Sequence, residues 1–204
     1  MIGGAKLVFF LCFALVSAVG GAHRALFGPR AQARKRLRNA SRELTDGAVV
    51  TLTGVVHAKG DTMTAPLSGR QAIAFSSTAR VYEGAGRHRK LVEQYHQQET
   101  SDFVLETKDG RVEIEAGGAE IAYAPEPLIP RQLEREQAFL AKAGSDARAR
   151  DGGFDEVVIE PGMKISVHGV VRIEVAGGES YREAGKRIVL SGHPAHPLTI
   201  GRPI

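Results

Sequence analysis

Cysteine and tryptophan are nearly missing from this chain. Its 204 residues include one cysteine and no tryptophan, and aromatic residues make up 6% of them. A single cysteine cannot form a disulfide within the chain, and it excludes a zinc site built from several cysteines. So few aromatic side chains also form a poor stacking surface for single-stranded nucleic acid. We therefore expect no structural zinc of this kind and no nucleic-acid partner.

Recognisable catalytic motifs are lacking as well. Neither Ser68-Gly69 nor Ser191-Gly192-His193 stands in the G-x-S-x-G elbow of the α/β hydrolases. The glycine pairs Gly117-Gly118 and Gly177-Gly178 lack the Lys and the Ser or Thr of a phosphate-binding loop. No reaction class follows from these residues, and we expect neither a cofactor nor a metal ion.

A long uncharged segment lies near the N-terminus. Leu7 to Ala22 contains no charged residue, and nine residues from Leu7 to Val19 are Leu, Val or Phe. As a helix, residues 5–22 would measure roughly 27 Å, which is short but sufficient for a hydrocarbon core of about 30 Å. Seven basic residues follow between Arg24 and Arg42. Because basic flanks stay in the cytoplasm, the pattern predicts one transmembrane helix with the C-terminal body on the cytoplasmic side.

A cleaved signal peptide is the alternative for this segment. Lys6 would be its basic start, and Gly20-Gly21-Ala22 resembles a small-residue cleavage site. The protein would then be exported, and its mature form would lack about the first twenty-two residues. The basic residues that follow the apolar segment favour the retained anchor.

The net charge is divided unevenly along the chain. Residues 1–44 hold eight Lys or Arg and one Glu, a net charge of +7, while the whole chain carries +4, so residues 45–204 carry −3. The basic character therefore belongs to a juxtamembrane segment, residues 23–46. Each basic residue close to anionic lipid gains about 1 kcal/mol. Membrane-surface contact is expected of Arg34, Lys35, Arg36 and Arg38.

The body, residues 47–204, has the residue alternation of strands. Asp109-Gly110 separates two alternating runs and predicts a hairpin in which Val112 and Ile114 face inward. Pro161-Gly162 and Gly177-Gly178 are predicted turns. The predicted strands are Val49–His57, Gln71–Tyr82, Phe103–Glu106, Arg111–Glu115, Glu156–Ile159, Lys164–Val175 and Arg187–Leu190.

Three segments have the composition of helices. Arg30–Leu44 is rich in good helix formers, and Arg131–Ala143 lies between Pro130 and Gly144. Arg87–Glu99 is polar and also predicts a helix. The apolar stripes are Leu91, Val92 and Tyr95 in the polar helix, and Leu133 with Gln137 and Leu140 in the last one. Ser145–Gly153 is predicted to be a mobile loop.

Two strands resemble each other. Val50–Val56 has the sequence V-T-L-T-G-V-V, and Ile165–Val171 has the sequence I-S-V-H-G-V-V. A glycine inside a strand marks a bend or a close backbone approach. Either the two strands have matching roles in a small, strongly curled barrel, or common strand residues coincide. The predicted fold is mainly β: a small OB-like β-barrel with one or two short helical insertions, after a single transmembrane helix.

The order of several segments resembles the GIDE domain, which occurs in membrane-bound mitochondrial E3 ubiquitin ligases and in bacterial relatives. The similarity extends over roughly residues 49–204. The matching segments are Thr53–Val56, Ala65–Ala72, Phe103–Glu106, Asp109–Ile114, Gly118-Ala119 and Glu156–Gly169.

This resemblance implies a β-rich, barrel-like domain beside a membrane. Ligase activity is not implied, because in the eukaryotic members it belongs to a C-terminal RING finger built on Cys and His zinc ligands. The one cysteine of this chain, Cys12, lies in the predicted membrane segment. The second membrane helix of those members is missing as well.

A few polar residues are candidates for catalysis or metal binding. Glu113 and Glu115 lie on one predicted strand face, where exposed carboxylates beside Arg111 are common. His193 and His196 are close in sequence, but Pro194 and Pro197 stiffen the segment and no carboxylate is near. A hydrogen-bonded structural role is expected of His168, which lies within a strand.

The predicted function is that of a membrane-anchored, non-enzymatic β-domain that binds a protein partner or anionic lipid. The alternatives are an exported protein and a hydrolase or transferase whose carboxylates or histidines come from scattered loops. A cleft that holds Glu113, Glu115 or His168 would favour an enzyme.

Overall fold

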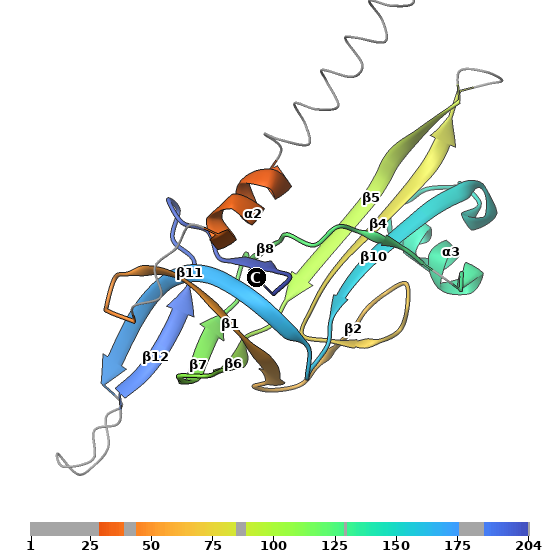
Figure 1. Ribbon diagram of the computed structural model, residues 1–204. Helices are drawn as coiled ribbons and strands as arrows, with labels where there is room; N and C mark the ends of the chain where they lie inside the picture. Colours follow the sequence, from red (N-terminus) through yellow and green to blue (C-terminus); the bar gives the residue numbers. More distant parts are fainter. Residues whose placement is uncertain (1–28, 39–43, 85–88, 129, 176–185, 204) are drawn as a thin grey trace, which may run out of the picture.

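The chain folds mainly into β-strands, arranged as a barrel with a second sheet beside it (Figure 1). The computed structural model describes residues 29–38, 44–84, 89–128, 130–175 and 186–203. The predicted transmembrane helix of residues 5–22 lies outside these ranges. Within them, no helix has both the length and the apolar character that crossing a bilayer requires.

Five strands close into the barrel. β1 pairs with both β6 and β11, so the hydrogen-bonded order β1-β6-β7-β12-β11 returns to β1. β7 and β12 run parallel, whereas the other neighbours are antiparallel. The barrel strands are β1 (Val49–Ala58), β6 (Phe103–Thr107), β7 (Gly110–Glu115), β11 (Lys164–Val175) and β12 (Lys186–Ser191). The prediction of a small, mainly β barrel is confirmed, and each predicted barrel strand lies within one residue of the observed bounds.

Alternate side chains of these strands fill the barrel. On the predicted hairpin, Val112 and Ile114 are each 1% exposed, so they face inward as expected. Fully burying a branched aliphatic or aromatic side chain contributes about 1.5–3 kcal/mol, and this core supplies many of them. Its members include Val50, Leu52, Val56, Phe103, Leu105, Ile165, Val167, Val171 and Leu190.

The two glycine-containing strands that resemble each other are neighbours. β1 and β11 pair so that Leu52 lies opposite Val167, which are equivalent positions of the two similar sequences. Both glycines allow a close approach. A Cβ at Gly54 would lie 2.8 Å from the carbonyl carbon of Glu106, and one at Gly169 would lie 2.8 Å from Leu198 Cδ1. The two strands therefore have matching roles, as the barrel interpretation requires.

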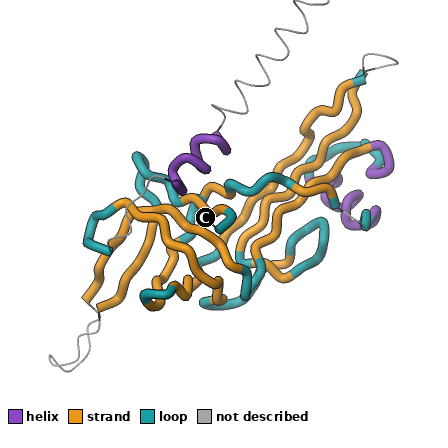
Figure 2. Tube along the Cα trace, in the orientation of Figure 1, coloured by secondary structure: helices purple, strands orange, loops and turns teal. Residues whose placement is uncertain are grey.

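A second sheet, in the order β5-β4-β10-β9, is built from two insertions into the barrel. Residues 59–102 connect β1 to β6, and residues 116–163 connect β7 to β11. We call this part the insertion lobe. It contains β4 (Ala74–Glu83), β5 (Lys90–Thr100), β9 (Glu126–Pro127), β10 (Gly152–Ile159), helix α3 (Leu133–Lys142) and the short helix η2 (Ala149–Asp151) (Figures 1 and 2).

Four short strands complete the described part. β2 and β3 pair with each other, and β8 and β13 extend the barrel sheet beyond β11. Their bounds are β2 (Met63–Thr64), β3 (Gln71–Ala72), β8 (Glu120–Ile121) and β13 (Thr199–Gly201). The predicted strand Gln71–Tyr82 is thus divided at Ile73 into β3 and β4.

The prediction of a helix over Arg87–Glu99 is wrong, because most of this segment forms β5. β5 is an edge strand that is exposed on much of both faces, so polar residues conceal the period of two. A β-bulge also interrupts the alternation of β5. Ala79 lies opposite Tyr95 and Arg80 opposite Glu93, which leaves Gln94 as the extra residue. The apolar stripe is therefore divided between the two faces of the sheet.

The helix prediction for Arg131–Ala143 is confirmed by α3, but its predicted buried face is wrong in part. Phe139 and Leu140 are buried against the sheet, whereas Leu133 is 41% exposed and Gln137 is exposed. Ser145–Gly153, predicted as a mobile loop, contains η2 and the start of β10. β10 begins four residues before the predicted strand Glu156–Ile159.

Candidate functional site

The helix predicted over Arg30–Leu44 is present in part as α2 (Pro29–Arg38), which packs on the barrel. Residues 39–43 lie outside the described ranges, and Leu44 is not helical. Ala33 and Leu37 are buried together with Ala122. Arg36 Nη1 donates to Glu120 Oε2 at 2.9 Å. A Cβ at Gly201 would overlap Leu37 Cδ1, so the glycine leaves room for the Leu37 side chain in its observed position. The helix therefore has a defined seat on the folded domain.

The four residues predicted to contact a membrane surface differ in this arrangement. Lys35 is exposed and available, whereas Arg36 is half-buried and paired with Glu120. The side chains of Arg34 and Arg38 lie outside the part of the structure that is described. Lys35 is thus the member of this set whose described surroundings suit lipid contact.

His168 lies on the outer face of β11 but is only 3% exposed. α2 contacts β11 and β1 on this side of the barrel. Its Nδ1 lies 3.2 Å from Thr51 Oγ1, while Nε2 makes no hydrogen bond to a described residue. Burial lowers the pKa of His168, and the charges of His196 and Arg36 lower it further. The prediction of a hydrogen-bonded structural histidine agrees with the Nδ1 contact.

This burial makes a prediction about acid stability. The unfolded histidine has a pKa near 6.5 and the folded pKa is lower, so between these two pKa values the unfolded state binds a proton that the folded state does not. Between about pH 7.5 and pH 5.5, His168 should lower the free energy of unfolding by at most ~1.4 kcal/mol per pH unit. Urea unfolding of the full chain in detergent should show a flatter pH dependence for His168→Gln. His96→Gln, which removes an exposed histidine, is the comparison variant.

Glu113 and Glu115 belong to a ladder of ion pairs on the outside of the barrel. Glu113 pairs with Lys59 and Arg187, and Glu115 pairs with Arg172 at 2.6 Å. Glu174 accepts from Arg172 at 2.8 Å and continues the ladder. The hydrogen bond from Lys59 is the largest cause that lowers the pKa of Glu113. Both carboxylates are therefore paired with cations on the barrel surface.

His193 and His196 form a tight turn. His193 N donates to His196 O at 3.0 Å, and His196 N donates to His193 O at 2.8 Å. Ala195 N donates to His193 Nδ1 at 3.2 Å, which occupies one possible ligand atom. Across the described ranges, no group of three or more His, Cys, Asp or Glu side chains is arranged to hold a metal ion.

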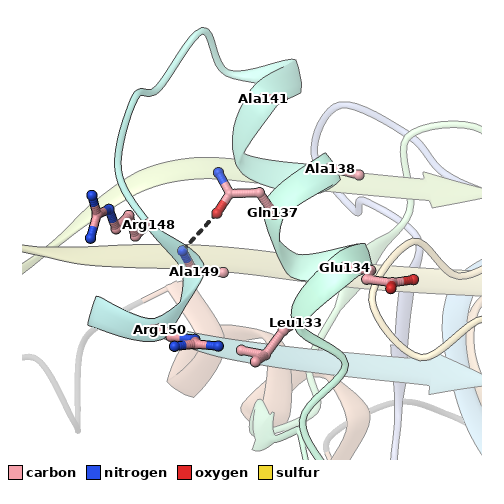
Figure 3. Close-up of a pocket in the computed structure, with 8 residues that line it drawn as sticks. All are labelled: Leu133, Glu134, Gln137, Ala138, Ala141, Arg148, Ala149 and Arg150. Atoms are coloured by element: carbon pink, nitrogen blue, oxygen red, sulfur yellow. Dashed lines mark hydrogen bonds between the residues drawn. The ribbon is translucent and has the colours of Figure 1, made fainter.

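An open groove that the sequence patterns did not indicate lies on α3. Its volume is about 630 Å³. Figure 3 shows α3 on one side and residues 148–150 on the other. Its lining residues are Leu133, Glu134, Gln137, Ala138, Ala141, Arg148, Ala149 and Arg150. Neither arginine makes an ion pair with any residue that the structure describes.

The two walls of this groove are held together by hydrogen bonds. Gln137 Oε1 accepts from Ala149 N at 2.9 Å (Figure 3), and Gln137 Nε2 donates to Ala147 O at 3.1 Å. Arg131 pairs with the buried Glu136 and donates to Ala149 O at 2.6 Å. The segment that carries Arg148 and Arg150 is therefore fixed to α3, so the groove is formed before any ligand arrives.

Comparison with known proteins adds no relative. No protein-family model, curated protein or solved structure matches this chain. A function for the chain is therefore inferred from the geometry of its described residues.

Proposed function

We propose that this chain is a membrane-anchored, non-enzymatic β-domain that binds a protein partner in the groove on α3. The observation that carries the proposal is the preformed groove itself. Its lining combines apolar side chains with two arginines that have no ion-pair partner among the described residues. The apolar side chains are the exposed Leu133 and the small Ala138 and Ala141. A partner segment with an apolar side chain beside acidic residues would fit this surface.

The placement of the groove supports an adaptor role. α2, which follows the predicted membrane segment, packs on the barrel, whereas α3 lies on the insertion lobe away from it (Figure 1). A partner bound on α3 would therefore contact the domain away from the surface on which α2 packs. The barrel would act as a rigid support between the anchor and the binding surface.

The OB-like fold and the GIDE resemblance belong to the same proposal. Numbered along the chain, the barrel strands have the spatial order first, second, third, fifth and fourth, with the third and fifth parallel. This Greek-key order in a five-stranded barrel supports an OB-like assignment. The cytoplasmic location rests on the basic residues that follow the apolar segment.

A photocrosslinking experiment tests partner binding at the groove. With benzoylphenylalanine in place of Ala138, the anchored full chain should form one defined crosslinked product in its own membrane. The same probe in place of the exposed Arg111, on the barrel, is the matched control and should not form that product. Products of equal yield and size from both positions would contradict the proposal.

A groove variant makes the expectation quantitative. Leu133→Asp should reduce the Ala138 crosslink about tenfold or more, because burying a leucine side chain contributes about 1.5–3 kcal/mol. Leu133 is 41% exposed, so the fold should survive the change. An unchanged crosslink yield with Leu133→Asp would show that the partner does not bind in the groove.

A further inference from the structure

The β4–β5 hairpin continues beyond the sheet that supports it. β10 ends its pairing with β4 at Gly152 opposite Val81. Two further pairs, Tyr82 with Leu91 and Glu83 with Lys90, extend past that point as a two-stranded ribbon. We call Tyr82, Glu83, Arg89, Lys90 and Leu91 the hairpin end. It is an outlying point of the described chain (Figures 1 and 2).

Large apolar side chains are exposed at this hairpin end. Tyr82 is 50% exposed and Leu91 is 43% exposed, and they lie opposite each other. They are two of the three exposed large apolar side chains in the described ranges, and the third is Leu133 in the groove. The Leu91 side chain reaches the position of Gly153 on β10, where an added Cβ would lie 3.4 Å from Leu91 Cδ2, and the glycine supplies no side chain to cover it. An aromatic ring and a leucine thus stay in contact with solvent.

Cationic groups surround these apolar side chains. The Arg89 guanidinium lies 4.7 Å from the centroid of the Tyr82 ring. Lys90 is exposed. Glu83, the acidic member, accepts a hydrogen bond from Gln94 at 2.6 Å. Arg89 and Lys90 are both exposed, and neither forms an ion pair with another described residue.

The hairpin end lies on the same side of the molecule as α2. In the view of Figure 1, both occupy the upper side, and the hairpin reaches further up than α2. α2 carries the exposed Lys35 and begins at Pro29, just after the predicted membrane segment. A membrane that meets the chain before α2 would therefore lie on the side to which the hairpin points.

We propose that the hairpin end contacts the headgroup region of an anionic membrane and forms a second membrane contact of the domain. This inference rests on the anchoring in the proposed function. Tyrosine rings are enriched at the membrane–water interface, where one end of the ring is apolar and the other is wet. Arginine and lysine beside them pair with the negative lipid headgroups. Tyr82 and Leu91 enter the membrane–water interface, while Arg89 and Lys90 pair with the negative charges of the lipid headgroups.

The absence of tryptophan provides the test. Tyr82→Trp places a single fluorophore at the hairpin end of the full chain, and Leu133→Trp places one at a similarly exposed position on α3. Each protein is reconstituted into vesicles of phosphatidylcholine with or without phosphatidylserine, and with or without brominated lipid. With phosphatidylserine present, the fluorophore of Tyr82→Trp should be blue-shifted and quenched by brominated lipid. The fluorophore of Leu133→Trp should show neither change.

Charge variants and flotation complete the experiment. Arg89→Gln in the Tyr82→Trp chain should lower the contact equilibrium about fivefold, the effect of one basic residue at an anionic surface. High salt should weaken the contact as well. If the protein floats with vesicles but Tyr82→Trp is quenched no more than Leu133→Trp, the hairpin contact is refuted and a protein becomes the ligand of this patch. If the protein does not float at all, the anchoring proposal itself fails.

Discussion

Gly54→Ala should destabilise the barrel by about 3 kcal/mol or more. The added Cβ would lie 2.8 Å from the carbonyl carbon of Glu106 and closer still to its oxygen. Gly54 belongs to β1 and Glu106 to β6, and these two strands pair in the barrel. Neither strand can therefore move away from the added methyl group without disturbing the closure of the barrel. Urea unfolding of the full chain in detergent measures the loss.

Gly60→Ala is the matched control for this substitution. A Cβ at Gly60 meets no atom within 4 Å, and the residue has no positive φ. The change should be neutral or stabilise by up to about 1 kcal/mol through the entropy of the unfolded chain. Equal unfolding midpoints for the two alanine variants would mean that β1 and β6 do not approach each other as closely at Gly54 as described.

Glu156→Ala should cost about 3 kcal/mol, because it removes the acceptor for two buried donors and one partly buried donor at once. Glu156 is 4% exposed. Its carboxylate accepts from Leu67 N at 2.9 Å, Ser68 N at 2.9 Å and Ser77 Oγ at 2.8 Å. Without the carboxylate, the turn at residues 65–70 loses its attachment to β10. Urea unfolding should show the loss, and limited trypsin digestion should cleave faster after Arg70.

The neighbouring carboxylate Glu160 provides the control for this effect. It pairs with Arg70 at 2.9 Å, but its side chain is 37% exposed and the side chain of Arg70 is 53% exposed. Exposed ion pairs contribute roughly 0–1 kcal/mol, so Glu160→Ala should change stability little. A similar loss in Glu156→Ala and Glu160→Ala would show that the buried hydrogen bonds are not what holds this turn.

Strands with one face in the barrel were predictable from the sequence, whereas the exposed edge strand was not. β1 and β7 alternate buried positions with positions that are only partly buried or exposed, because each has one face in the core. β5 has little to bury on either face, and the bulge at Gln94 shifts its alternation midway. Its Gln, Glu and Lys residues then resemble a helix surface.

The candidate sites depended on contacts between distant segments, which local patterns do not contain. Glu156 binds backbone groups of Leu67 and Ser68, 89 and 88 residues earlier in the chain. The groove forms only when Gln137 holds the segment of Ala149 against α3. By contrast, the surface positions of Glu113 and Glu115 followed from strand alternation alone, although their partners Lys59 and Arg172 did not.

The seam between β4 and β10 has a consequence for engineering. It joins residues 74–81 to residues 152–159, which belong to different insertions into the barrel. Transplanting one insertion into a foreign scaffold would leave a long row of backbone donors and acceptors unpaired, and such an exposed strand edge promotes aggregation. The two insertions depend on each other for strand pairing, so chimeras of this domain should exchange both insertions together or leave both in place.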